Sequence, residues 1–216
     1  MRSGRISRPE CERGSIEAPR GVLNETRAPK QTMRTLAALL DLLALDRLPR
    51  TGWLQAGVPA PESVAAHSLG TCLLALTLGP AVVPELDVDR AVALAAVHDA
   101  PEAWLGDMPR RGAEHLPPGA KRAAEAAIAD ELLGALSAAA RERFREYQAG
   151  ATREARFAGL CDHLHLGLRL LGYARAGQRG LEGFAEGLEG LDCREFAPCA
   201  ELQRELLAAL RTALRS

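Results

Sequence analysis

Residues 91–102 read AVALAAVHDAPE, an apolar run that ends in a histidine and an aspartate side by side. Asp87 precedes the run, and its side chain can accept hydrogen bonds from the free amides at the start of a helix. Pro101 follows the polar pair and prevents the helix from continuing unchanged. The stretch therefore predicts a buried helix over about 89–98 that carries two polar side chains at its end.

The composition of the whole chain also favours helices. Its 216 residues are 47% hydrophobic and 25% charged, which is enough for one compact domain with a sizeable core. Leucine and alanine dominate, whereas valine occurs 8 times and isoleucine 3 times. Sheets are normally rich in these β-branched residues, so the sequence predicts a single-domain, all-α protein.

Hydrophobic periodicity predicts further helices on both sides of this run. Leu36, Leu39, Leu40 and Leu43 repeat at the spacing of one helical face, which predicts a first helix from Met33 to about residue 48. Proline and glycine predict irregular connections over 50–61 and 106–119. Other helices are expected over 63–78, 120–136, 137–148, a long segment capped by Thr152, 181–190 and 198–214.

Residues 1–32 contain scattered charges, glycine and proline but no apolar repeat that could pack. We expect a flexible N-terminal tail over 1–32 and one folded domain over 33–216.

Charge and cysteine content limit the partners and the compartment. The 27 basic and 28 acidic residues give a net charge of −1, which disfavours binding to nucleic-acid polymers.

Residues 63–84 carry no charged residue besides His67, but Gly79 and Pro80 interrupt the span, so we expect a helix surrounded by protein on most sides rather than a membrane segment. The five cysteines show no paired or C-x-x-C spacing, which favours a reducing, cytoplasmic compartment.

Four polar residues stand where the apolar pattern predicts the interior, namely His67, His98, Asp99 and Asp162. A single one would most simply be a hydrogen-bonded core residue. Burying an unpaired imidazole or carboxylate is costly, however, and two imidazoles with two carboxylates on three helices can surround a divalent cation. The four together predict a metal site between the central helices.

These residues also resemble a known family. The order of His67, the doublet His98-Asp99 and Asp162 is similar to the H...HD...D pattern of HD-domain metal-dependent phosphohydrolases. The surrounding sequence motifs resemble those of the 5'-deoxynucleotidase branch and its relatives called HD-domain-containing protein 2, over roughly 34–175. They are RTGW at 50–53, PESVAAHS at 61–68, HDAPE at 98–102, GDMP at 106–109, EY at 146–147 and TREARF at 152–157.

The resemblance implies a fold, a cofactor and a reaction. It implies an all-helical domain in which His67, His98, Asp99 and Asp162 hold one divalent ion such as Co²⁺, Mn²⁺ or Zn²⁺. It further implies hydrolysis of (deoxy)nucleoside 5'-monophosphates to nucleoside and phosphate, and a homodimer. Two alternatives stay open, a triphosphohydrolase or pyrophosphohydrolase of the same fold and a non-catalytic nucleotide-binding regulatory protein.

Four further residues are candidates for catalysis or substrate binding. Glu102 lies close to the doublet and is the candidate for proton transfer, or else it caps a helix start. Asp107 is expected to orient water or a sugar hydroxyl, or is a turn residue. Arg50 is a candidate phosphate clamp and Trp53 a candidate contact to base or sugar, with an exposed arginine and a core tryptophan as the alternatives.

Some positions depart from the pattern of the deoxynucleotidase branch. The arginine that directly precedes the tryptophan there is replaced by Gly52, with Arg50 two residues earlier, so the phosphate contacts stay open. Basic residues that could take their place are Arg110, Arg111, Lys121 and Arg122. His165 lies three residues after Asp162 and is interpreted as a neighbour of the ligands or an alternative ligand, and His115 as a possible ligand of a second ion.

Overall fold

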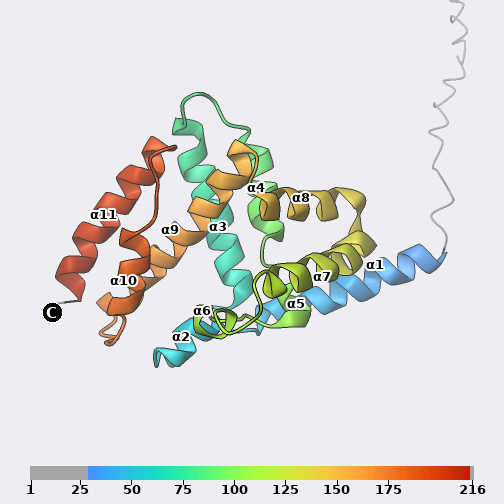
Figure 1. The fold of residues 1–216 in the computed structure, drawn as a ribbon, viewed down its shortest axis with the longest axis horizontal. Helices are drawn as coiled ribbons and strands as arrows, with labels where there is room; N and C mark the ends of the chain where they lie inside the picture. Colours follow the sequence, from blue (N-terminus) through green and yellow to red (C-terminus); the bar gives the residue numbers. More distant parts are fainter. Residues whose placement is uncertain (1–28, 215–216) are drawn as a thin grey trace, which may run out of the picture.

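The computed structural model describes residues 29–214. All of the secondary-structure elements in that part of the chain are helices (Figure 1). The α-helices are α1 (Pro29–Leu42), α2 (Thr51–Gln55), α3 (Val64–Leu78), α4 (Val88–Val97), α5 (Glu102–Leu105), α6 (Arg110–Ala113), α7 (Ala120–Leu136), α8 (Ala138–Ala149), α9 (Arg153–Arg175), α10 (Glu182–Glu189) and α11 (Ala197–Ala213). Two 3-10 turns, η1 (Leu43–Asp46) and η2 (Gly79–Ala81), follow α1 and α3. The all-α prediction is confirmed.

Three helices form the centre of the bundle. The helices α3, α4 and α9 pack against one another, and Figure 1 shows α9 crossing in front of α3. The helices α10 and α11 cover α9 on one side, while α7 and α8 pack together on the other side, where α8 also contacts α4 and α9. The largest core cluster joins Phe157 and Leu164 of α9 to Leu206 of α11. The predicted buried helix of residues 91–97 therefore lies in the middle of the molecule.

Local capping explains where the central helices begin. The side chain of Asp87 accepts a hydrogen bond from the Arg90 amide at 2.9 Å, and that of Thr152 accepts one from the Ala155 amide at 3.2 Å. Each bond satisfies an amide that has no partner inside the helix. Both predicted N-caps are confirmed.

The boundaries differ from the predictions in three places. The first helix begins at Pro29, four residues before Met33, whereas residues 1–28 of the predicted tail lie outside the described part of the chain. The segments 50–61 and 106–119, predicted as irregular, contain the short helices α2 and α6. A single helical turn is too short to show a hydrophobic period, so the sequence pattern could not reveal it.

The leucine row of the first helix is present but faces outward. Leu36, Leu39, Leu40 and Leu43 are between 51% and 58% exposed. Periodicity indicates which residues share a helix face, but not which element covers that face.

The apolar helix α3 is also more open than predicted. Three of its leucines are exposed, namely Leu69, Leu73 and Leu76. The window Val64–Ala81 is long and apolar enough to span a membrane by length and composition, and one third of it is buried within the bundle. Its buried side carries His67 and Thr71 and packs against α4 and α9. The expectation that protein surrounds this helix on most sides is therefore wrong.

Candidate metal centre

The structure brings His67, His98, Asp99 and Asp162 together at the junction of α3, the end of α4 and α9. The Nε2 atom of His67 lies 2.8 Å from Asp162 Oδ1 and 3.8 Å from Asp99 Oδ2. The Nε2 atom of His98 lies 3.1 Å from Asp99 Oδ2 and 3.9 Å from Asp162 Oδ1. The Nε2 atoms of the two histidines thus each face one carboxylate oxygen of Asp99 and one of Asp162.

His98 is oriented by the backbone of its own helix. Its Nδ1 donates a hydrogen bond to the Ala95 carbonyl at 2.7 Å, which directs the lone pair of Nε2 toward the carboxylates. That Nε2 is buried and makes no aligned hydrogen bond. Burial lowers the pKa of His98, but the negative charges of Asp99 and Asp162 outweigh this effect and raise it to about 9.

Asp162 is held from both sides. Its Oδ1 faces His67, and its Oδ2 accepts a hydrogen bond from the hydroxyl of Tyr147 at 3.3 Å. Burial raises the pKa of Asp162, yet the hydrogen bond from His67 and the nearby imidazoles lower it well below its usual range. The sequence pattern did not assign a role to Tyr147, because α8 shows only a peripheral amphipathic pattern.

The four donor atoms fit a divalent cation of the first transition row. Such ions bind imidazole nitrogen and carboxylate oxygen at about 2.0–2.2 Å, which places neighbouring donor atoms roughly 3–4 Å apart. The distances above, from 2.8 to 3.9 Å, span this range. The unpartnered Nε2 of His98, which points into the same space, is the kind of atom that a cation satisfies.

Arg50 enters the site from the segment before α2. Its Nη1 lies 2.8 Å from Asp107 Oδ1, 3.2 Å from Asp99 Oδ2 and 3.9 Å from Glu102 Oε2. The second oxygen of Asp107 accepts a hydrogen bond from the Thr51 amide at 2.5 Å. Asp107 therefore holds the guanidinium of Arg50 beside the proposed ligands, rather than standing free as a turn residue.

Glu102 begins α5, and its side chain points into the same cluster. One of its oxygens, Oε2, is buried without a hydrogen-bond partner. Burial, and then the charges of Asp99 and Asp107, raise the pKa of Glu102 to about 9. A carboxyl group in this environment can hold a proton near neutral pH, which is what a general acid requires.

Trp53 is interpreted from the sequence either as a contact to the base or sugar or as a core residue, and the structure places it in the core. It is 2% exposed, stacks on Phe184 with ring centroids 4.1 Å apart, and contacts Tyr173 edge to face. Its Nε1 donates a hydrogen bond to Glu62 Oε1 at 3.4 Å. Little of this side chain is left to contact a base or a sugar.

A second buried layer lies behind His67. The sequence placed His165 beside the ligands, but it did not predict the roles of Glu62 and Arg169 there. Glu62, just before α3, forms an ion pair with Arg169 of α9, with Oε2 and Nε 2.7 Å apart. The Nδ1 atom of His165 lies 3.0 Å from His67 Nδ1 and 3.9 Å from Glu62 Oε2. Burial, followed by the charges of His67 and Arg169, lowers the pKa of His165 to about 3. The one available signal was polar spacing on α9, where Asp162, His165 and Arg169 recur on one face.

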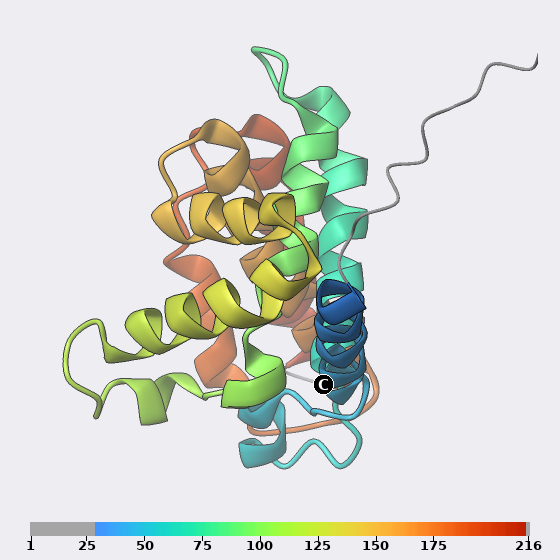
Figure 2. The same ribbon diagram turned by 90° about the vertical axis from the view of Figure 1, so that its right-hand side faces the viewer.

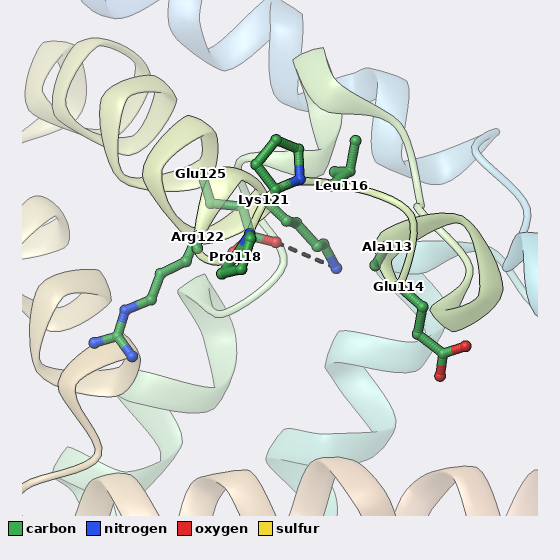
Figure 3. Close-up of a pocket in the computed structure, with 9 residues that line it drawn as sticks. Ala113, Glu114, Leu116, Pro118, Lys121, Arg122 and Glu125 are labelled. Carbon is green, nitrogen blue, oxygen red and sulfur yellow. Dashed lines mark ion pairs between the residues drawn. The ribbon is translucent and has the colours of Figure 1, made fainter.

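Among the described residues, two groups of three could hold a metal ion: one is Glu62, His67 and His165, and the other is His67, His98 and Asp99. Asp162 faces His67 and His98 beside the second group. His115 belongs to neither group. Instead, His115 follows α6, in the loop that borders a cleft of about 450 Å³ (Figure 3). Lys121 extends across this cleft and pairs with Glu125 at 3.3 Å, and its charge also acts on Glu102. Of the basic residues considered for phosphate contacts, Lys121 and Arg122 line the cleft.

The chain is thus an all-helical protein with a candidate metal centre, in which two histidines and two aspartates meet at α3, the end of α4 and α9. The chain belongs to the HD domain family, whose family model matches residues 44–186. The human protein named 5'-deoxynucleotidase HDDC2 is 31% identical over 145 residues, covering 65% of this chain and 69% of the relative. The Schizosaccharomyces pombe protein named 5'-deoxynucleotidase hdd1 is 29% identical over 161 residues, covering 69% and 79%.

A solved structure shares the fold. The PH0347 protein from Pyrococcus horikoshii OT3 superposes with a TM-score of 0.69 at 31% sequence identity. The match covers 82% of this chain and 98% of that protein. The likeness extends over the central helices that carry the candidate centre and identifies the bundle as the HD-type fold that the sequence predicted.

Proposed function

We propose that this chain is a metal-dependent phosphohydrolase that converts (deoxy)nucleoside 5'-monophosphates to nucleoside and phosphate. Membership of the HD domain family and two relatives named 5'-deoxynucleotidase support the reaction class. The observation that carries the proposal is the convergence of four donor atoms, with the buried Nε2 of His98 left unpartnered among them. The proposed ligands are His67, His98, Asp99 and Asp162.

The residues around these ligands supply what phosphate-ester hydrolysis needs. When bound, a divalent ion lowers the pKa of a water nucleophile and polarises a phosphoryl oxygen. Arg50, held by Asp107, places a permanent positive charge where phosphoryl charge must be compensated. Glu102, buried 3.9 Å from Arg50, is placed to move the proton that the leaving 5'-oxygen requires.

The ion is proposed to be Co²⁺, Mn²⁺ or Zn²⁺. Imidazole nitrogen suits transition metals such as Zn²⁺, and carboxylate oxygen also suits Mn²⁺, whereas Mg²⁺ and Ca²⁺ prefer sites made of oxygen alone. Two nitrogen donors against two oxygen donors therefore favour a transition metal.

The reaction is tested by offering deoxynucleoside and ribonucleoside mono- and triphosphates with each of the three ions. We expect orthophosphate and nucleoside from the monophosphates, with faster release from the deoxy forms. Chromatography of the released phosphate species is the measurement, because pyrophosphate or tripolyphosphate would instead identify one of the alternative hydrolases. Nucleotide binding without any turnover would identify a regulatory protein and overturn the proposal.

We also propose that the enzyme is a homodimer that buries the exposed leucine rows of α1, η1 and α3. Leu36, Leu40 and Leu43 form one row, and Leu69 and Leu73 belong to the other. Figure 2 shows α1 and α3 along the same side of the molecule, and η1 connects the two helices through its contacts with each. Large exposed apolar patches on soluble proteins mark interaction surfaces, and a second copy offers the same rows in a symmetric pairing.

Replacing Leu40 with arginine is expected to shift the protein from dimer to monomer, because the charge would be buried without a partner in the interface. Sedimentation or light scattering should give twice the chain mass of 23.1 kDa for the unaltered protein and about that mass for the variant. Leu54→Arg is the control, since Leu54 is 44% exposed on α2, outside both rows. An unaltered protein that is monomeric at tens of micromolar would contradict this interface.

We propose a cytoplasmic location because the described cysteines are not joined in disulfides. In the described part of the chain, Cys72, Cys161, Cys193 and Cys199 are all free thiols. Unpaired buried thiols are typical of proteins from reducing compartments.

A further inference from the structure

The two ring nitrogens of His67 have different surroundings. Nε2 faces the carboxylates of Asp99 and Asp162, whereas Nδ1 lies 3.0 Å from the Nδ1 of His165. An imidazole that offers the lone pair of Nε2 to a cation carries its proton on Nδ1, and it needs an acceptor for that proton. The group beside Nδ1 therefore determines both the tautomer and the direction of the ring.

Glu62 is the other polar residue near His67 Nδ1, but it is too far away to accept a hydrogen bond from that nitrogen. Its Oε1 lies 3.9 Å from His67 Nδ1, beyond hydrogen-bond distance. Its carboxylate is also engaged by Arg169 at 2.7 Å and by Trp53 at 3.4 Å. Within residues 29–214, His165 is thus the residue positioned to accept the proton of His67 Nδ1.

The packing of α3 against α9 is shaped around the His165 ring. A Cβ atom at Gly70 would overlap the Nε2, Cδ2 and Cε1 atoms of His165, so the ring lies directly on the backbone of α3. His165 is 6% exposed and follows Asp162 by three residues on α9. One helix therefore carries both a proposed ligand and the side chain that fixes another ligand.

We propose that His165 is a positioning residue, which accepts the Nδ1 proton of His67 and holds the Nε2 of His67 toward Asp162 and Asp99. Carboxylates, backbone carbonyls and water are the usual partners of a ligating histidine, and His98 follows that rule through Ala95. His67 differs, because its partner would be the imidazole nitrogen of His165 instead of an oxygen atom. The inference deepens the proposed metal centre and rests on it.

The first test examines the hydrogen bond itself in protein loaded with Zn²⁺, because without an ion Asp162 Oδ1, 2.8 Å away, accepts a hydrogen bond from His67 Nε2. Histidine labelled with ¹⁵N reports, by its nitrogen shifts, which ring nitrogen of each residue carries the proton. We expect His67 to be protonated on Nδ1 and His165 on Nε2, with the Nδ1 signal of His67 moved when His165 is replaced. His67 protonated on Nε2, or a His67 signal unaffected by the replacement, would overturn the proposal.

The second test measures Co²⁺ and Zn²⁺ affinity by competition with a chelator. His165→Leu removes the acceptor, and we expect affinity to fall about 10–100-fold, as it does when such supporting groups are lost. His165→Asn places an amide oxygen close to the position of Nδ1, and we expect it to restore most of the affinity. Equal loss in both variants, with unfolding curves unchanged, would show a steric role and contradict the proposal.

His163→Asn is the matched control for these measurements. His163 is on the same helix, but it is exposed, and its Nδ1 donates a hydrogen bond to the Gly159 carbonyl at 2.8 Å. Its Nδ1 lies 3.8 Å from Asp162 Oδ2, beyond hydrogen-bond distance. Its replacement is expected to leave metal affinity within about twofold of the unaltered protein, the range typical of surface substitutions. A stoichiometry of two ions per chain that falls to one in His165→Leu would make His165 a ligand and overturn the positioning role.

These readouts separate the inference from the proposed function. A protein that binds the ion with the expected histidine tautomers but hydrolyses no nucleotide would retain the role of His165 and refute the nucleotidase. If His165→Leu kept full metal affinity and still hydrolysed nucleotides, the nucleotidase would be supported and the positioning role of His165 refuted. If the leucine variant does not fold, the tautomers in the unaltered protein and the affinity of His165→Asn still decide.

Discussion

Replacing Asp99 with alanine is expected to abolish metal binding and to lower the rate of phosphate release by about 10³-fold or more. Asp99 Oδ2 lies 3.1 Å from His98 Nε2 and 3.8 Å from His67 Nε2, so its loss removes one of four converging donors. Catalysis by a divalent ion contributes several kcal/mol to the stabilisation of transition-state charge, and each 1.36 kcal/mol corresponds to about tenfold in rate. Metal analysis of the purified variant and its initial rates are the measurements.

Asp89→Ala is the control for this variant. Asp89 is an exposed carboxylate in the first turn of the same helix, α4, and its loss is expected to cost only about 0.3–1 kcal/mol of stability through the helix dipole. It should bind metal like the unaltered protein. A metal content that is the same in Asp99→Ala and Asp89→Ala would refute the assignment of Asp99 as a ligand.

Replacing Glu102 with glutamine is expected to leave the metal in place and to lower kcat by about 10²–10⁴-fold, the usual contribution of a general acid or base. The amide keeps the shape of the side chain but cannot exchange the proton. Because burial and the neighbouring carboxylates raise the pKa of Glu102 to about 9, its side chain is already uncharged near neutral pH, and the uncharged amide is expected to leave the unfolding temperature unchanged there.

The measurements are single-turnover rates, metal content and thermal unfolding of Glu102→Gln. Glu131→Gln, an exposed glutamate on α7, is the control and should match the unaltered protein in all three. If Glu102→Gln turned over as fast as the control, Glu102 would have no part in proton transfer, and its burial would serve only to pair with Arg50.

Much of the fold could be predicted because it depends on local chemistry. The caps at Asp87 and Thr152 were visible in the sequence, since a side-chain oxygen three residues before a free amide is a local arrangement. The limits of the apolar helix before His98 followed from its composition and from Pro101. Short helices such as α2 and α6 were missed because one turn leaves no periodic signal.

The sequence predicted the members of the centre, and it placed His165 beside them, but it did not predict the contacts that support them. Buried imidazoles and carboxylates are costly, so their presence in apolar helices predicted that they would meet. Nothing local in the sequence indicated that Asp107 would hold Arg50, that Tyr147 would hold Asp162, or that His165 would face His67. Those pairs are separated by 57, 15 and 98 residues, and only the packing of distant helices joins them.

By itself, therefore, the sequence determined that this chain is helical, where its main helices begin and which polar residues could not stay alone in its interior. These properties follow from hydrogen bonds within a few residues, from hydrophobic periods and from the cost of burying charge. The tertiary structure alone decided that the leucine row of α1 faces outward, that Trp53 belongs to the core and that His67 has an imidazole as its partner. Each of these depends on which helix packs against which, and a helix's own sequence does not encode the neighbour that will cover it.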